Sequence, residues 1–219
     1  AALANMFLQV DKNMQMLQRT YGIGGEAGKA FSSSLPSPAE LDAIKSQIQG
    51  VAQQMANLYG QSAQETTGVA AALSAAGYTQ TQLVGLTRTV SQAMVLGETD
   101  QQSAIKATIS LQTAYKLSTQ QTADAMNFFS AAQAATSTTM KDLIDAIPRV
   151  GPIVRNLGGT YKDTVAFLVA MKEGGVGASD GANALKNSLQ RLIVPTAASV
   201  KSLKEMGINI TDIVKNNTG

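Results

Sequence analysis

Two segments near the start of the chain carry apolar residues spaced alternately three and four positions apart. In residues 1–21 the series is Leu3, Phe7, Val10, Met14, Leu17 and Tyr21, and in residues 39–59 it is Leu41, Ile44, Ile48, Val51, Met55 and Leu58. This spacing is the a/d pattern of a coiled-coil seam. Each series is shorter than three heptads, below the ~3–4 that indicate a coiled coil, so two amphipathic helices on a globular core are the alternative.

Residues 22–38, GIGGEAGKAFSSSLPSP, separate these two helices and are predicted to be a linker. The segment is rich in Gly and Ser, and Pro36 and Pro38 close it. We treat the apolar series of residues 39–59 as a candidate seam for self-association or for a partner protein.

From residue 60 onwards the pattern changes to short helices with repeated start signals. A Ser or Thr followed three residues later by Gln or Asp predicts a helix N-terminus, because its side chain accepts a free backbone N–H of the first turn. Such pairs begin at Thr79, Thr99, Ser118, Thr139 and Thr160, with Ser179 and Thr211 as weaker members. The period is about 20 residues. Glycines that predict helix ends are Gly77, Gly97, Gly158, Gly159 and Gly177.

Residues 174–212 form the most distinctive stretch, a glycine-rich turn, a helix, Pro195 and a second helix that Gly207 ends. The apolar face of this stretch predicts four buried side chains: Leu185, Leu189, Leu192 and Leu203. We interpret RLIVP at 191–195 as a helix end before proline rather than a strand. Pro148 and Pro152 are predicted to break a helix near Ile147.

These patterns predict an all-α protein in which N-terminal amphipathic or heptad helices precede a compact module of short, capped, antiparallel helices. The expected divisions are a helix (1–21), a linker (22–38), a heptad-patterned helix (39–59), the module (60–212) and a tail (213–219). One continuous helix of 219 residues would reach roughly 330 Å. The repeated helix ends after residue 60 exclude such a rod.

Composition removes several classes of function. The chain has no Cys and no His, so thiol chemistry and the usual general base are absent. Its net charge of +2 gives no electrostatic case for nucleic acid. No apolar run approaches the roughly 20 residues that span a bilayer, and no secretion signal is visible. The chain does not begin with Met, which predicts that it is part of a longer protein.

Three candidate motifs for chemistry fail on inspection. GIGGEAGKA lacks the first Gly and the hydroxyl residue of a phosphate-binding loop, and GGVGASDG at 174–181 lacks the last Gly of a dinucleotide fingerprint. Asp142 and Asp145 lie on one helix, but no His or Cys accompanies them, so solvated charges are the favoured interpretation. We therefore expect no catalytic, cofactor-binding or metal-binding residues, and no enzyme.

The stretch from about Gln64 to Asp212 resembles the family domain of phage tail tape-measure proteins. The residues that carry the resemblance are GGVGASDGANAL, LKNSLQRLIVPT and EMGINITD, supported by TQTQLVGLTRTVSQAMVLGET and the segment from Lys116 to Val176. Family turns often have Gly-Thr-Ala where this chain has Gly181-Ala182-Asn183.

The resemblance implies a structural virion protein in the lumen or tip of a phage tail. Such a protein sets tail length during assembly and leaves ahead of the genome on ejection. It implies other tail proteins, of the tube or tip, as partners. A homo-oligomer is expected, with a trimer as one candidate, but no specific nucleic acid. The alternative is a membrane-inserting helical module, carried by segments such as Val69–Gly77, that forms a conduit during DNA delivery and contacts the host envelope transiently. A cell-wall hydrolase is a third, less favoured hypothesis.

Overall fold

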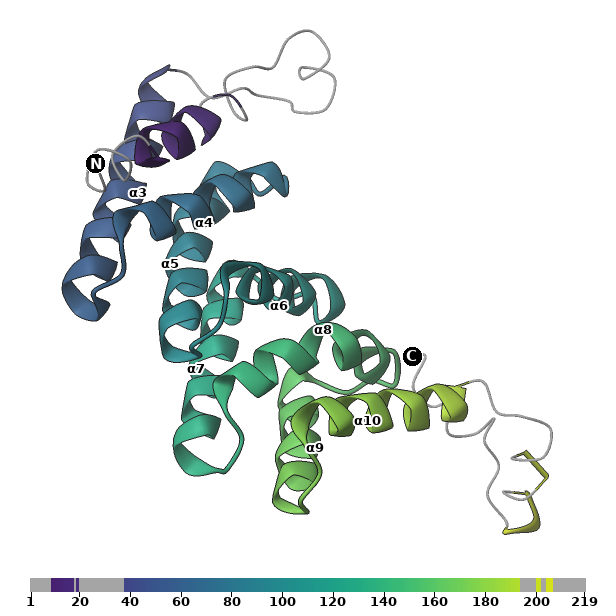
Figure 1. Cartoon of the computed structure of the whole chain (residues 1–219). Helices are drawn as coiled ribbons and strands as arrows, with labels where there is room; N and C mark the ends of the chain where they lie inside the picture. The colour runs from purple at the N-terminus through teal and green to yellow at the C-terminus, as the bar shows by residue number, and fades with distance from the viewer. Residues whose placement is uncertain (1–8, 18, 20–37, 194–199, 202–203, 207–219) are drawn as a thin grey trace, which may run out of the picture. The chain divides into compact units, whose positions relative to one another are not determined.

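The computed structural model describes residues 9–17, 19, 38–193, 200–201 and 204–206. Residues 9–17 are helical, and eight further helices follow in the described part (Figure 1). Their bounds are α3 Pro38–Tyr59, α4 Ala63–Ala75, α5 Gln80–Leu96, α6 Gln101–Ala114, α7 Thr119–Ala135, α8 Met140–Asn156, α9 Tyr161–Glu173 and α10 Ala178–Ile193. No strand occurs among the described residues, and the all-α prediction is confirmed.

The heptad-patterned helix of residues 39–59 is observed as α3, which begins one residue earlier at Pro38. α3 thus includes Pro38, the last residue of the predicted linker. Proline suits the first helical turn, because the N–H that it lacks would have no intrahelical partner there. The rest of the predicted linker and residues 213–219 lie outside the described residues, and the predicted divisions of the chain stay predictions.

The chain divides into two compact units, Ala1–Ile105 and Lys106–Gly219. In unit 1, α3 packs against both α4 and α5, and α4 packs against α5. The core of this unit takes apolar side chains from each helix, among them Ile48, Val51, Met55, Val69, Leu73, Leu83, Leu86 and Val90. Met14 and Leu17, from the helical residues 9–17, are buried as well.

Polar side chains also connect the elements of unit 1. The amide nitrogen of Asn13 donates hydrogen bonds to the backbone oxygen of Gln64 (3.3 Å) and to Thr67 Oγ1 (3.2 Å). Arg88 on α5 donates to Gln54 Oε1 on α3 at 3.0 Å. These hydrogen bonds orient the helices relative to one another, and burial of apolar side chains holds the helices together.

Unit 2 is built on α8, which packs against α7, α9 and α10. α10 also packs across α9, and α7 contacts α9. The largest fully buried side chains of this unit are Leu111, Phe129, Met140, Leu143, Ile144, Ile147 and Leu168. The antiparallel arrangement of sequential helices stays a prediction.

The prolines of α8 do not break it, contrary to the sequence-based prediction. The helix runs from Met140 to Asn156 with Pro148 and Pro152 inside. Each proline removes one backbone donor and costs about 3 kcal/mol. The same helix buries Leu143, Ile144, Ile147 and Val150 completely, which contributes about 1.5–3 kcal/mol per side chain. Burial of the apolar stripe therefore outweighs the two missing hydrogen bonds.

Predicted N-caps are observed at the starts of α7, α8 and α9. Ser118 Oγ accepts from the Gln121 N–H at 3.2 Å, and Gln121 Oε1 accepts from the Ser118 N–H at 2.9 Å. The same reciprocal bonds join Thr139 to Asp142 and Thr160 to Asp163. At the start of α5, the Thr79 N–H donates to Gln82 Oε1 at 3.2 Å.

Two predicted caps were wrong. Asp100, not Thr99, caps α6: its Oδ1 accepts from the Ser103 N–H at 2.9 Å, while Thr99 Oγ1 is buried without a hydrogen-bond partner. A carboxylate is the stronger acceptor here, and the hydrogen bonds from Ser103 lower the pKa of Asp100. Ser179 lies inside α10, where its Oγ accepts from Arg149 Nη1 at 3.0 Å.

One cap escaped the sequence analysis, although its signature is visible. Ser62 and Glu65 form a complete capping box at the start of α4, with Ser62 N to Glu65 Oε2 at 3.0 Å and Glu65 N to Ser62 Oγ at 3.2 Å. The Ser-x-x-Glu pattern predicts this geometry. Thr211, the last predicted cap, lies outside the described residues.

The predicted burial in the C-terminal stretch is tested at two positions. Leu185 on α10 is buried, whereas Leu189 is only partly covered. α10 ends at Ile193, as expected for a helix that stops before Pro195. The side chains of Leu192 and Leu203, and the proline corner itself, lie outside the described residues.

Candidate functional site

The carboxylate pair that the sequence singled out is engaged in ion pairs. Asp142 Oδ2 lies 3.3 Å from Lys172 Nζ on α9, and Asp145 Oδ2 lies 2.8 Å from Lys141 Nζ one turn earlier on α8. Asp142 also takes part in the cap of α8. The two carboxylates therefore have separate ion-pair partners. Within the described ranges, no group of His, Cys, Asp and Glu has a metal-binding arrangement.

The glycine-rich segment of residues 174–181 is a helix start in the structure. GGVGASDG leads into the first turn of α10, which begins at Ala178, so it is a helix-start turn as expected. GIGGEAGKA lies outside the described residues.

The candidate seam on α3 faces the interior of unit 1. Ile44, Ile48, Val51 and Met55 are buried, Leu41 is partly covered, and Leu58 is 70% exposed. The outward positions of α3, among them Asp42, Gln49, Gln53 and Asn57, are polar. The seam is thus occupied by α4 and α5 in this structure. Its role in self-association stays a prediction, and Leu58 is its exposed member.

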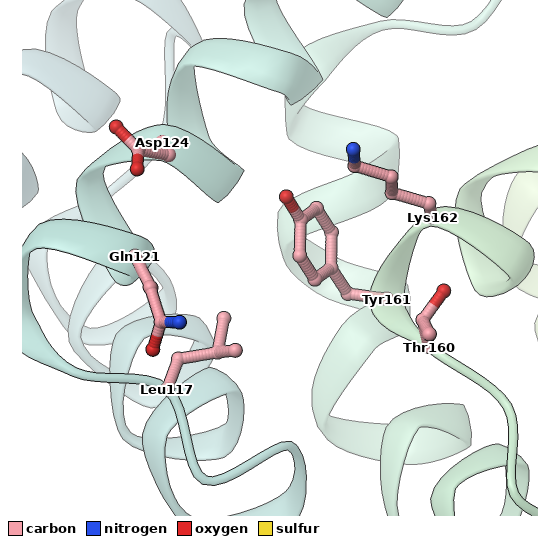
Figure 2. A pocket seen from close by; sticks show the side chains of 6 residues that line it. All are labelled: Leu117, Gln121, Asp124, Thr160, Tyr161 and Lys162. Atoms are coloured by element: carbon pink, nitrogen blue, oxygen red, sulfur yellow. The ribbon is translucent and has the colours of Figure 1, made fainter.

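A pocket of about 300 Å³ lies between the start of α7 and the first turn of α9 (Figure 2). It is lined by Leu117, Gln121 and Asp124 from one side and by Thr160, Tyr161 and Lys162 from the other. Leu117 and the Tyr161 ring give it apolar walls. Figure 2 shows the amide nitrogen of Gln121 turned toward the ring of Tyr161, and the Asp124 carboxylate turned away from that ring.

Hydrogen bonds fix the orientation of these side chains on α7. Gln121 Oε1 accepts from the Ser118 N–H at 2.9 Å, so the amide nitrogen is the group left for the pocket. Asp124 Oδ1 accepts from Gln120 Nε2 at 3.1 Å, on the neighbouring face of the helix. The two residues are held by contacts within one helical turn.

Aromatic contacts position the α9 side of the pocket. The Tyr161 ring packs edge-to-face against Phe128 at 6.0 Å between centroids and against Tyr115 at 6.3 Å. Lys162 Nζ lies 5.7 Å from the centroid of the Phe128 ring. Burial, and secondly the negative charge of Asp124, raise the pKa of Tyr161, so its hydroxyl stays protonated at neutral pH.

Sequence reasoning missed this pocket for a clear reason. Its two walls come from segments about 40 residues apart, and each wall by itself is an ordinary helix start. Gln121, Asp124 and Phe128 lie at helical spacing on one face of α7, and Leu117 lies just before this helix. A mixed polar and apolar stripe of this kind does not by itself indicate a pocket.

Comparison with known proteins identifies the family of this all-α chain. Residues 45–218 match the family of phage-related minor tail proteins. The chain belongs to this family, whose members are structural proteins of phage tails. The resemblance to tape-measure proteins is confirmed, and the role that the comparisons support is structural.

A specific relative is the tape measure protein of Pneumococcus phage Dp-1. It is 26% identical over 140 residues, which cover 64% of this chain and 12% of the phage protein. The chain thus corresponds to a small part of that relative's length. The comparison with solved structures gives no significant match. Among the described residues, no helix combines the length and apolarity needed to cross a bilayer.

Proposed function

We propose that this chain is a folded module of a phage tail tape-measure protein, located in the tail lumen or tip. The full protein would set tail length during assembly and take part in genome ejection. The observation that carries the proposal is the match of 64% of the chain to 12% of a tape measure protein. A segment of this size is one part of a longer protein.

The helix lengths indicate which part of that role the module performs. α3, the longest helix at 22 residues, spans about 33 Å, and α4 to α10 have 13 to 17 residues each. Capped ends and buried cores hold these helices as packed units. The module would therefore contribute a surface that binds other tail proteins, rather than the extended length of a ruler.

In-frame deletion and duplication of residues 60–212 in the full-length protein of its phage would test this proposal. An extended helix of that size would change tail length by roughly 230 Å. We expect both variants to change the length in electron micrographs by far less, and the deletion to impair tail completion or infectivity. A change near 230 Å in both variants would show that the segment acts as the ruler. Normal, infective tails after the deletion would contradict a role in assembly or ejection.

We propose other tail proteins, of the tube or tip, as partners, together with further copies of the chain. A trimer is one candidate for the oligomer. Self-association through α3 would use Leu58, the exposed member of the seam. Light scattering on the full chain and on Leu58→Gln measures this contribution, because the substitution leaves the buried seam residues in place. An oligomer of unchanged size and affinity would remove the seam from the proposal.

The membrane-inserting alternative has a different requirement. Val69, Ala70, Ala71 and Leu73 are buried in unit 1, so the segment Val69–Gly77 would have to leave that core before it met a lipid surface. Leakage of dye from anionic vesicles on addition of the folded chain would favour the alternative over a purely structural module. Intact vesicles would favour the structural role.

A further inference from the structure

The pocket between α7 and α9 combines three hydrogen-bond donors that have no acceptor in the described part of the chain. They are the amide nitrogen of Gln121, the hydroxyl of Tyr161 and the ammonium group of Lys162. Figure 2 shows the Tyr161 hydroxyl and the Lys162 ammonium at the same end of the pocket. One of the three donors is positively charged, so the pocket favours an acceptor with negative charge.

We propose that this pocket binds the carboxylate of an acidic side chain, glutamate or aspartate, from a partner protein. The Lys162 ammonium and the Tyr161 hydroxyl would hold the carboxylate oxygens. Leu117 and the Tyr161 ring would cover the methylene groups of the bound side chain. The choice of a protein as the source of the carboxylate rests on the proposed function, whereas the chemistry of the pocket does not.

The alternative of a cationic occupant is weaker, because the one carboxylate at the pocket faces elsewhere. Asp124 is turned away from the Tyr161 ring and accepts from Gln120 on its own helix. Its charge still acts at the pocket, since it contributes to the raised pKa of Tyr161. Asp124 therefore weakens the binding of an anion without supplying a site for a cation.

The proposal does not depend on backbone N–H groups at the start of α9, two of which are used in the cap of this helix. The Thr160 N–H donates to Asp163 Oδ2 at 2.7 Å, and the Asp163 N–H donates to Thr160 Oγ1. The donors on which the proposal rests are side chains, which can be removed one at a time. Lys162 is placed by its contact with the Phe128 ring, a weak attraction at an exposed site that a charge-assisted hydrogen bond can replace.

The size of the pocket favours one side chain over a larger ligand. Its volume of about 300 Å³ is at the lower limit of the roughly 300–1,000 Å³ typical of small-molecule sites. A single glutamate has a carboxylate for the polar end and two methylene groups for Leu117 and Tyr161. Since an isolated side chain makes few contacts, affinity for it alone is on the order of millimolar.

Nuclear magnetic resonance titration of the 219-residue chain tests the proposal with two matched probes. Nα-acetylglutamate α-amide carries the carboxylate, and Nα-acetylglutamine amide has the same shape without the charge. We expect saturable shifts of the Leu117, Tyr161 and Lys162 amide signals with the first probe, and affinity at least roughly threefold lower with the second. The titration uses a small molecule and no other tail protein. A negative result would therefore contradict the binding site in the pocket without contradicting the proposed function, which the tail-length experiment tests separately.

Single substitutions inside and outside the pocket test which side chains contribute to binding of the charged probe. Lys162→Gln should weaken binding at least roughly threefold and Tyr161→Phe roughly twofold, whereas Asp124→Asn should strengthen it. Lys106→Gln removes an equal charge from unit 2 outside the pocket and should leave affinity unchanged. Equal binding of both probes, no effect of Lys162→Gln, or no saturable shift at the pocket would overturn the proposal. Preferential binding of Nα-acetylarginine amide that Asp124→Asn abolishes would overturn it too.

Discussion

Tyr115 and Thr164 share a hydrogen bond between their hydroxyl groups, which lie 2.5 Å apart in the interior of unit 2. Tyr115 follows the end of α6, and Thr164 lies in α9. The Tyr115 ring also packs against Tyr161 and covers Gly151 on α8. One side chain after α6 thereby fixes the positions of α8 and α9, and the wall of the pocket depends on it through Tyr161.

Tyr115→Phe is expected to destabilise the chain by about 1 kcal/mol, the usual net value of one buried hydrogen bond. Thr164 keeps an acceptor, because its Oγ1 also donates to the Thr160 backbone oxygen at 3.2 Å. The thermal midpoint should therefore fall by about 2–4 °C. Tyr59→Phe is the control: Tyr59 is 37% exposed, so its hydroxyl should contribute under 0.5 kcal/mol. Equal midpoints for Tyr115→Phe and the wild-type chain would show that the buried bond contributes no stability.

The same pair predicts how stability depends on alkaline pH. Burial raises the pKa of Tyr115, the hydrogen bond with Thr164 opposes this, and the charge of Asp163 adds to it. The folded state therefore holds the phenol proton more tightly than the unfolded state, whose pKa is about 10. Stability from this proton is fully present below pH ~10 and is lost as the pH rises through the folded pKa.

Denaturant unfolding of the wild-type chain and Tyr115→Phe between pH 7 and 11 measures this effect. The difference in unfolding free energy between the two should shrink above pH ~10, since only the wild-type chain loses the contribution of Tyr115. Tyr78 and Tyr161, whose pKa values burial also raises, are present in both proteins and cancel. A constant difference across this range would mean that Tyr115 does not ionise differently in the folded state.

Gly151→Ala and Gly50→Ala form a matched pair with different expected effects on stability. A Cβ at Gly151 would lie 3.0 Å from Tyr115 Cε2 and 3.3 Å from its hydroxyl oxygen, whereas a Cβ at Gly50 on α3 meets nothing within 4 Å. Alanine gains up to ~1 kcal/mol of helix propensity at either position. At Gly151, overpacking costs typically 1–3 kcal/mol. Gly50→Ala should raise the thermal midpoint, and Gly151→Ala should lower it or leave it unchanged.

A contrary result would be informative about the Tyr115 ring. If Gly151→Ala were as stabilising as Gly50→Ala, the ring would have to move without cost. Loss of the chemical-shift signature of the Tyr115–Tyr161 contact in that variant would identify such a movement.

Local interactions explain why much of the fold was predictable. The caps at Ser118, Thr139 and Thr160 form within four residues, so their sequence patterns suffice. The predicted N-cap at Thr99 was wrong because a stronger hydrogen-bond acceptor, Asp100, follows it directly. The periodicity of α3 predicted the helix and its apolar face.

Contacts between distant segments explain the rest. Nothing in the pattern of α3 distinguishes a second copy of the chain from α4 and α5 as the cover of its apolar face. The prolines of α8 are tolerated because of the core that the helix fills, which is a property of the packed unit. The pocket is lined by both Gln121 on α7 and Tyr161 on α9, which are distant in the sequence and come close only in the folded chain.

The last prediction concerns the end of α5, where a residue other than glycine adopts a positive φ. The glycine stops Gly77 and Gly158 were predicted, and both have positive φ, +88° and +84°. After α5 the expected stop Gly97 keeps a helical φ of −94°, and Glu98 adopts +46° instead. The end of α9 uses Gly175, at +83°, rather than Gly177. Hydrogen bonds from Glu98 N to Val95 O (3.3 Å) and from Thr99 N to Met94 O (3.1 Å) hold Glu98 in this conformation.

Glu98→Gly should therefore stabilise unit 1. A left-handed conformation costs a residue with a Cβ about 1–2 kcal/mol, and glycine loses about 0.5–1 kcal/mol more backbone entropy on folding, so the expected net gain is about 0.5–1 kcal/mol. Glu98→Ala removes the same carboxylate but keeps the Cβ, and it should show none of this gain in denaturant unfolding. Gly77→Ala places a Cβ at φ +88° and should lose about 1 kcal/mol. If Glu98→Ala matched Glu98→Gly, the charge of Glu98 and not its backbone conformation would be the source of the change.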